Sequence, residues 1–258
     1  MKHKGIRFIV IFILFISVVI AFFLSPLFNI KEIEILPMEY YEPEDVYVHL
    51  TDLLGKNGFY EIMKNKSLTQ SESIFSLDLS EREDKLIFEC PYLRDVKISF
   101  DLPNKIVVST KERKPIFLIK DYSVYLYIDD EGFLLSTFTE EEELPNLPIV
   151  QGLGLEGYKV GQPITKTENE KVDTIIKLCK MIDELSMSKG MIDIIDVTDP
   201  EDIWFYTYPS LSVKFGDSKD LGVKLSFLKE IFKAGFDGNS DGVIDLSLGG
   251  DPIFRKND

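Results

Sequence analysis

The sequence is short of the residues on which hydrolytic enzymes depend. Its 258 residues include only two histidines, and His49 is the only one beyond the basic start of the chain. Any Ser-His-Asp triad would therefore have to use His49. A lone histidine on a predicted helix usually faces solvent or packs against its neighbours. We predict that the protein is not an enzyme and needs no cofactor.

Two Ser-x-x-Lys sequences occur, at residues 186–189 and 226–229. Penicillin-binding enzymes use this spacing, with the serine as nucleophile. They also need Ser-Asp-Asn and Lys-Thr-Gly sequences, and the chain contains neither. We therefore interpret both Ser-x-x-Lys sequences as chance matches.

Cysteine is equally scarce, since Cys90 and Cys179 are the only two. A disulfide framework usually has four or more cysteines in a short chain. Each of the two lies within an apolar pattern, which predicts a buried, unpaired side chain. One long-range disulfide between them is the alternative, because the compartment predicted below can be oxidising.

Positive charge is also in short supply. The chain has 29 lysines and arginines against 44 acidic residues, and its net charge is -15. Three of the basic residues (Lys2, Lys4 and Arg7) stand together at the start, so the remainder is more acidic still. Phosphate-rich partners need a basic surface, so we predict that the protein binds no nucleic acid.

One apolar run stands out, at residues 8–28, and it contains no charged residue. A helix rises ~1.5 Å per residue, so this run is long enough for the ~30 Å hydrocarbon core of a bilayer. The basic residues before it predict a cytoplasmic tail at 1–7 and an extracytoplasmic location for everything after residue 28.

A cleaved signal peptide is the alternative interpretation of this run. Its apolar region would be shorter and would end at a small-x-small site. Ala21 is instead followed by Phe22 and Phe23. We therefore predict an uncleaved, single-pass anchor in the cell membrane.

Residues 29–112 have the pattern of a small mixed module. Ile33 and Ile35 alternate with glutamates, which is typical of a half-buried strand. A helix is expected over 43–54, with Pro43 in its first turn and Gly55 as its stop. Residues 56–73 are polar and predict an irregular insertion.

A second helix and a hairpin complete this module. Ser80 and Glu83 form a capping box at the start of the helix, which ends at Pro91. Residues 96–100 and 105–110 then alternate around a Leu-Pro-Asn turn, which predicts two paired strands. The expected order is strand, helix, helix, strand, strand.

Three stretches of this module resemble the FtsQ/DivIB family of bacterial cell-division proteins. They are Cys-Pro-Tyr-Leu-Arg-Asp-Val-Lys-Ile at 90–98, Leu-Pro-Asn at 102–104 and Lys-Glu-Arg-Lys-Pro at 111–115. The resemblance implies that residues 29–112 form a POTRA domain, placed directly after the membrane anchor. It also implies that the Glu-Arg-x-Pro junction opens a second, β-rich domain.

Residues 113–250 fit that second domain. A hairpin is expected from strands 122–128 and 133–136 around a turn that ends at Gly132. A helix starting at Thr167 buries Cys179, and a later helix covers 219–234. The remaining expected strands are 192–197, 203–208, 211–215 and 243–248. We predict an α+β fold with a short C-terminal tail at 251–258.

The turn after the last helix resembles the start of a calcium-binding EF-hand loop. Asp237, Asn239 and Asp241 occupy the first three ligand positions. Leu248 stands where the loop requires a bidentate glutamate, and no second helix follows. We interpret the segment as a plain turn, with a weak calcium site as the alternative.

Strand 243–248 is the most plausible binding surface if it lies at a sheet edge. An edge strand offers unpaired N–H and C=O groups to a partner strand, and this one carries no lysine to prevent pairing. Ile244, Leu246 and Leu248 are expected to face the core, with Val243, Asp245 and Ser247 outward.

The resemblance implies what such a strand would bind. In the family, the last strand and the residues after it bind bitopic coiled-coil proteins of the FtsL and DivIC/FtsB kind. Carried over by position, the candidate partner-binding residues are Val243, Asp245, Ser247, Leu248, Gly249, Gly250 and Phe254. A simple closing strand with no partner is the alternative for these residues.

The function implied is that of a scaffold at the division septum. Such a protein would join its bitopic partners and help to control the septal peptidoglycan synthase, itself a further implied partner. The alternative is a POTRA-bearing surface protein of a secretion or sporulation complex.

Overall fold

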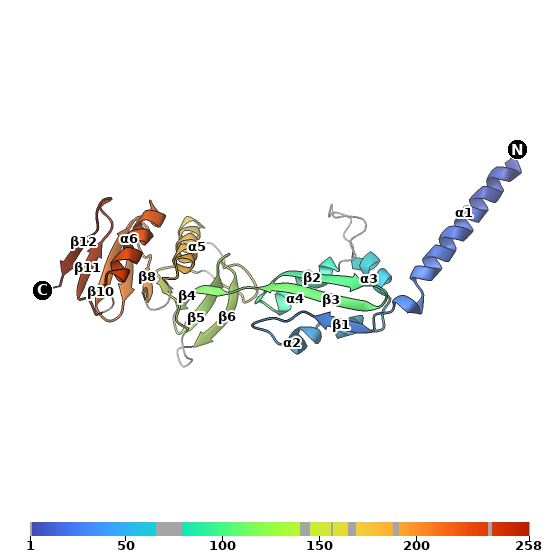
Figure 1. Cartoon of the computed structure of the whole chain (residues 1–258), viewed down its shortest axis with the longest axis horizontal. Coiled ribbons are helices and arrows are strands. Elements are labelled where there is room, and N and C mark those ends of the chain that lie inside the picture. Colours follow the sequence, from blue (N-terminus) through green and yellow to red (C-terminus); the bar gives the residue numbers. More distant parts are fainter. Residues whose placement is uncertain are drawn as a thin grey trace. The chain divides into compact units, whose positions relative to one another are not determined.

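The computed structural model begins with a long apolar helix, α1 (Lys2–Phe23), followed by a 3-10 turn, η1 (Pro26–Phe28) (Figure 1). The structure describes residues 2–65, 79–139, 145–155, 157–164, 169–187, 191–236 and 239–257. The stretch Gly5–Phe28 is long and apolar enough to cross a membrane; most of it is exposed, and Phe28 at its end is buried. The chain divides into two units, Met1–Glu112 and Arg113–Asp258.

The first unit builds a three-stranded sheet with short helices. Its elements after η1 are β1 (Glu32–Ile35), α2 (Pro43–Tyr47), η2 (Thr51–Leu53), α3 (Gly58–Asn65), α4 (Ser80–Glu89), β2 (Leu93–Asp101) and β3 (Lys105–Glu112). The strand order is β1-β3-β2, with β1 parallel and β2 antiparallel to β3. The hairpin expected at 96–110 is present as β2 and β3.

The helix expected over 43–54 is broken into α2 and η2. Past Tyr47 the backbone bonds tighten to three-residue spacing, as in His49 N–H to Val46 O and Leu50 N–H to Tyr47 O. The tighter turn still buries Leu50 and Leu53. The expectation of one continuous helix was therefore wrong. Of the apolar face expected for it, Val46, Leu50 and Leu53 are buried and Leu54 is exposed.

A further helix, α3, lies where an irregular insertion was expected. The Asn57 side chain caps it, since its Oδ1 accepts the Tyr60 N–H at 3.1 Å. Ile62 anchors the helix in the core. The expectation was therefore wrong for residues 58–65, and the rest of the expected insertion lies largely outside the described residues.

The second unit is built on a nine-stranded sheet of order β12-β11-β10-β9-β8-β7-β4-β5-β6 (Figure 1). The strands are β4 (Pro115–Asp121), β5 (Val124–Asp129), β6 (Leu134–Thr139), β7 (Ile149–Gln151), β8 (Ile194–Asp196), β9 (Ile203–Thr207), β10 (Leu211–Gly216), β11 (Gly242–Asp245) and β12 (Ile253–Lys256). The helices are α5 (Asn169–Glu184) and α6 (Leu221–Lys233).

Both helices pack on one face of this sheet. Phe117 and Ile119 of β4 join the apolar residues of α5 and α6 in a single core. Leu118 points the other way and packs with Tyr125 and Phe138 in a smaller cluster. The alternation along β4 shows that the two clusters lie on opposite faces of the sheet. The fold is α+β, as the sequence predicts.

The cysteines are buried and unbonded in both units. Cys90 lies in the core of the first unit and Cys179 in that of the second. Burial raises the pKa of the Cys90 thiol to about 11 and raises that of Cys179 further. Both thiols are therefore protonated and unreactive near neutral pH.

The C-terminal part of the sheet differs from the expectation. Strand 243–248 was expected to end the sheet, but β11 stops at Asp245 and lies between β10 and β12. Asp245 Oδ1 accepts hydrogen bonds from Ser247 N–H at 3.0 Å and Ser247 Oγ at 2.7 Å, and this local turn ends β11. The chain then reverses, so the expected tail at 251–258 contains the edge strand.

Candidate functional site: the β12 edge

The edge strand β12 pairs with β11 through four residues, from Ile253 opposite Asp245 to Lys256 opposite Gly242. Every residue of β12 is exposed. Within the described chain, no strand pairs with its other side. An open antiparallel edge with exposed side chains can accept a further strand.

Phe254 is the large apolar side chain of this edge, and 42% of it is exposed. Its ring meets that of Phe236 in an edge-to-face contact with centroids 4.9 Å apart. The ring also lies over Gly242, where an added Cβ would be 2.7 Å from it. Glycine at 242 therefore leaves the space that Phe254 occupies.

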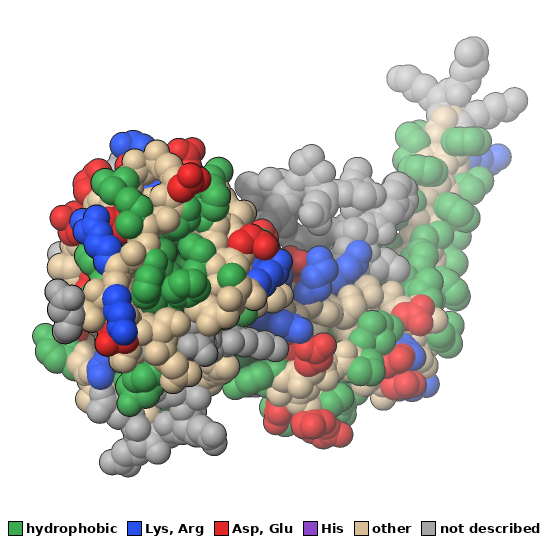
Figure 2. Space-filling view, turned by 60° about the vertical axis from the view of Figure 1, so that its left-hand side comes forward, with side chains coloured by type: hydrophobic (Ala, Val, Ile, Leu, Met, Phe, Trp, Pro, Cys, Tyr) green, Lys and Arg blue, Asp and Glu red, His purple; other side chains and the backbone are tan. Residues whose placement is uncertain are grey.

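An apolar groove of about 390 Å³ runs between β12 and the C-terminal half of α6. It is lined by Phe227, Glu230, Ile231, Ala234, Phe236, Ile244, Pro252 and Phe254. Glu230 is the only charged residue among them. Figure 2 shows hydrophobic side chains gathered on the forward face of the C-terminal unit, with basic side chains beside them.

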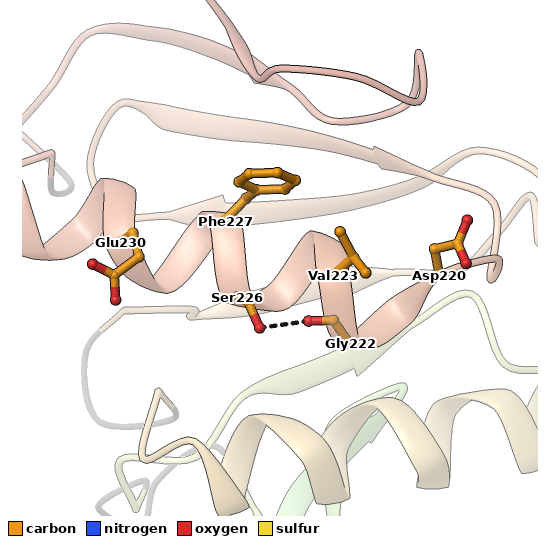
Figure 3. A pocket seen from close by; sticks show the side chains of 6 residues that line it. All are labelled: Asp220, Gly222, Val223, Ser226, Phe227 and Glu230. Atoms are coloured by element: carbon orange, nitrogen blue, oxygen red, sulfur yellow. Dashed lines mark hydrogen bonds between the residues drawn. The ribbon is translucent and has the colours of Figure 1, made fainter.

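A second hollow, of about 670 Å³, lies along α6 (Figure 3). Val223 and Phe227 project from the same side of the helix, and both are exposed. Ser226 turns its hydroxyl back to Gly222 O at 2.7 Å and so offers no free donor. Phe227 and Glu230 line both hollows, so the apolar surface is continuous from α6 to Phe254.

Known proteins resemble the chain over most of its length. A Clostridium tetani protein named Cell division protein DivIB is 26% identical over 93% of this chain and 84% of its own. A Clostridium botulinum protein of the same name is 28% identical over 98% and 92%. Cell division protein FtsQ of Myxococcus fulvus is 30% identical over 42% of this chain and 37% of its own. No family model matches the chain.

Over most of its length, the chain is similar to proteins of the FtsQ/DivIB family. The resemblance inferred from its sequence is thereby confirmed. With its apolar N-terminal helix, it is a membrane-anchored cell-division protein.

Two of the expected partner-binding residues lie on β11 rather than on an edge. Val243 is half-buried and Asp245 is buried. Burial alone would raise the pKa of Asp245, but hydrogen bonds from Ser247 and the charges of Arg255 and Lys214 hold that pKa below its usual value. Asp245 therefore anchors the turn, and the expectation that it faces outward was wrong.

The residues after β11 form the turn into β12. Ser247 is half-buried and bonded to Asp245, while Leu248, Gly249 and Gly250 are exposed. Leu248 was expected to face the core, but the turn at Asp245 breaks the alternation before it. Ile244 and Leu246 are buried as expected.

Of the expected partner-binding residues, only Phe254 lies on the open edge. Sequence reasoning missed Ile253, Arg255 and Lys256, which complete β12. The available signal was a β-forming Ile-Phe pair after the Gly-Gly-Asp-Pro turn. All four residues are exposed and show no burial alternation, so periodicity alone could not have found the strand.

The structure describes only some of the expected calcium ligands. Asp237 lies outside the described residues, and Asp241 Oδ1 accepts a hydrogen bond at 2.7 Å from Asn257, just beyond β12. No group of three acidic, histidine or cysteine side chains in the described chain is placed to hold a metal. A plain turn stays the prediction for this segment, with a weak calcium site as the alternative.

Two sequence features that hydrolases use, a histidine and a nucleophile turn, lie in different units of this chain. His49 Nδ1 lies 2.8 Å from Glu89 of α4, within the first unit. Residues 238–242 read Gly-Asn-Ser-Asp-Gly, which has the letter pattern of a hydrolase nucleophile turn. That turn joins a strand to a following helix, whereas Ser240 follows α6 and precedes β11.

Proposed function

We propose that this chain is a non-enzymatic scaffold of the division septum. In this proposal, β12 adds a strand from a bitopic partner of the FtsL or DivIC/FtsB kind. The observation that carries it is the open edge of β12, exposed along its length at the end of a nine-stranded sheet. The apolar groove beside Phe254 would receive a side chain of the added strand.

The opposite edge of the sheet, at β6, is less suited to pairing with a partner strand. At the start of β6, Leu134 N–H donates to Gln162 O and Leu134 O accepts from Gly161 N–H, both at 2.9 Å. Residues 161–164 therefore already occupy part of that edge. This contrast favours β12 as the strand that a partner pairs with.

The proposed membrane topology rests on the basic residues at the start of α1. A cytoplasmic N-terminus places both units outside the cytoplasm, where septal peptidoglycan is made. By holding bitopic partners there, the scaffold would help to regulate the septal peptidoglycan synthase.

The test is a binding measurement on the full-length protein in detergent. Its affinity for the soluble regions of FtsL-like and DivIC/FtsB-like proteins is measured. The wild type is compared with a version that lacks residues 252–258. This deletion removes β12 and leaves β11 in place. We expect affinity to fall at least ~10-fold, because strand addition depends on the edge.

The control is Tyr122→Ala, which changes a fully exposed side chain of the same unit. It should bind like the wild type. Circular dichroism checks that the truncated protein keeps its fold. Undiminished binding by a folded truncation would refute the role of β12, and absence of binding by the wild type would refute the choice of partner.

A further inference from the structure

The end of the membrane helix is tied to helix α3 of the first unit. The Asn57 side-chain amide donates hydrogen bonds to Phe23 O and Ser25 O, both at 3.1 Å. The Phe59 ring meets those of Phe23 and Phe28 at centroid distances of 4.7 and 5.0 Å. Figure 1 shows α3 beside the lower end of α1. The start of α3 is therefore fixed next to the point where the anchor ends.

From the length of the apolar stretch, we expect this point to lie at the level of the lipid headgroups. The apolar stretch Gly5–Phe28 has 24 residues, whereas ~20 helical residues span the hydrocarbon core. Its last residues, including the exposed Leu24 and Leu27, are thus at the boundary between acyl chains and water. The contacts of Asn57 and Phe59 bring α3 to the same boundary.

Helix α3 has one face in the core and, among the described residues, one exposed face. Ile62 is buried, whereas Tyr60 and Met63 are 56% and 74% exposed. Positions 60 and 63 are three residues apart, so their side chains lie on the same side of the helix. Exposed Lys64 follows Met63, and Lys56 precedes the helix.

We propose that α3 rests on the outer surface of the bilayer, with Tyr60 and Met63 inserted among the headgroups. The occupant of this face is the lipid surface itself, because the face continues the boundary that the anchor has already reached. Tyrosine is enriched at this depth, and lysines beside it can keep their ammonium groups in water. Short amphipathic helices bind membranes in this way. This contact goes beyond partner binding by β12 and does not depend on it.

The experiment places an environment-sensitive fluorophore on Met63→Cys in the full-length protein, reconstituted into phospholipid nanodiscs. Both native cysteines are buried, so the label goes to the introduced thiol. Nitroxide groups on the lipid headgroups serve as quenchers. We expect emission from position 63 to be quenched several-fold more than emission from a label on Val48→Cys.

Val48 is the matched control because it is an exposed apolar residue of the same unit. If Met63→Cys fails to fold, Tyr60→Cys takes its place with the same expectation. Equal quenching at the test and control positions would overturn the proposal. So would protection of position 63 from aqueous iodide without lipid quenching, which would instead indicate a protein contact.

Discussion

At the scale of single residues, Asp129 and Arg113 form an ion pair near the start of the second unit. Asp129 is fully buried and receives hydrogen bonds from Glu131 N–H and Phe133 N–H, each at 2.8 Å. It also pairs with Arg113, whose guanidinium lies 4.1 Å from the centre of the Phe133 ring. The arginine of the Glu-Arg-x-Pro junction is therefore part of a buried ion pair that closes the β5–β6 hairpin.

Asp129→Ala is expected to destabilise the second unit by about 3–5 kcal/mol. The substitution leaves the Arg113 charge buried without its main partner and frees two backbone N–H groups. Urea unfolding followed by near-ultraviolet circular dichroism measures the change. Asp130→Ala is the neighbouring control, and a comparable loss there would contradict the assigned role of Asp129.

Gly242→Ala is expected to destabilise the sheet by about 1–3 kcal/mol, because the new methyl would overlap Phe254 and the Arg255 carbonyl. The same substitution should also weaken capture of the partner, since it displaces β12. Gly250→Ala is the matched control, because nothing lies within 4 Å of the position its Cβ would take. Equal stability of the two variants would show that β12 does not depend on this glycine.

Asp245 makes stability depend on pH. Folding lowers its pKa, so it stabilises the fold above its unfolded pKa of ~3.9. This contribution is lost as pH falls through that value toward the lower folded pKa. Asp245→Asn should therefore lose less stability than the wild type between pH 5 and pH 2, in urea midpoints measured across that range. Asp251→Asn, on the exposed turn before β12, should follow the wild type.

At the scale of elements, the sequence predicted those whose burial follows a simple period. Helix α5 buries Val172, Cys179 and Ile182 on one side, as its 3.6-residue pattern requires. The β5–β6 hairpin and its turn at Gly132, where φ is +77°, were also predicted. Helix α3 was missed because its cap, Asn57, lies within a polar stretch.

The candidate site was predicted only in part for a related reason. Placing a strand at an edge depends on which strand pairs with which, and this is a long-range property that local pattern does not contain. Phe254 was reached through family resemblance, while the rest of β12 has neither alternation nor burial. Local hydrogen bonds between Asp245 and Ser247 ended β11 earlier than its apolar residues suggested.

At the scale of the whole molecule, each unit has its own core. The carboxylate of Glu112 accepts hydrogen bonds from Tyr40 N–H at 2.8 Å and Tyr41 N–H at 3.2 Å, within the first unit. The next residue, Arg113, is bonded within the second. Consecutive residues are thus bonded within different units.

We expect the two units to respond separately to substitutions at this junction. Hydrogen exchange of the full-length protein, followed by mass spectrometry, should show faster exchange in 31–47 for Glu112→Ala and in 115–139 for Asp129→Ala. Each variant should leave the other unit at its wild-type rate. Faster exchange across both units in either variant would mean that they unfold together.

The four-residue pairing of β12 with β11 has a mechanical consequence. A partner strand added to β12 would transmit any tension to this short, exposed pair before the wider sheet deforms. The pair would separate under load while the other strands and the membrane anchor stayed intact. In the proposed complex, the outermost strand would thus limit the force that a bound partner can apply to the rest of the protein.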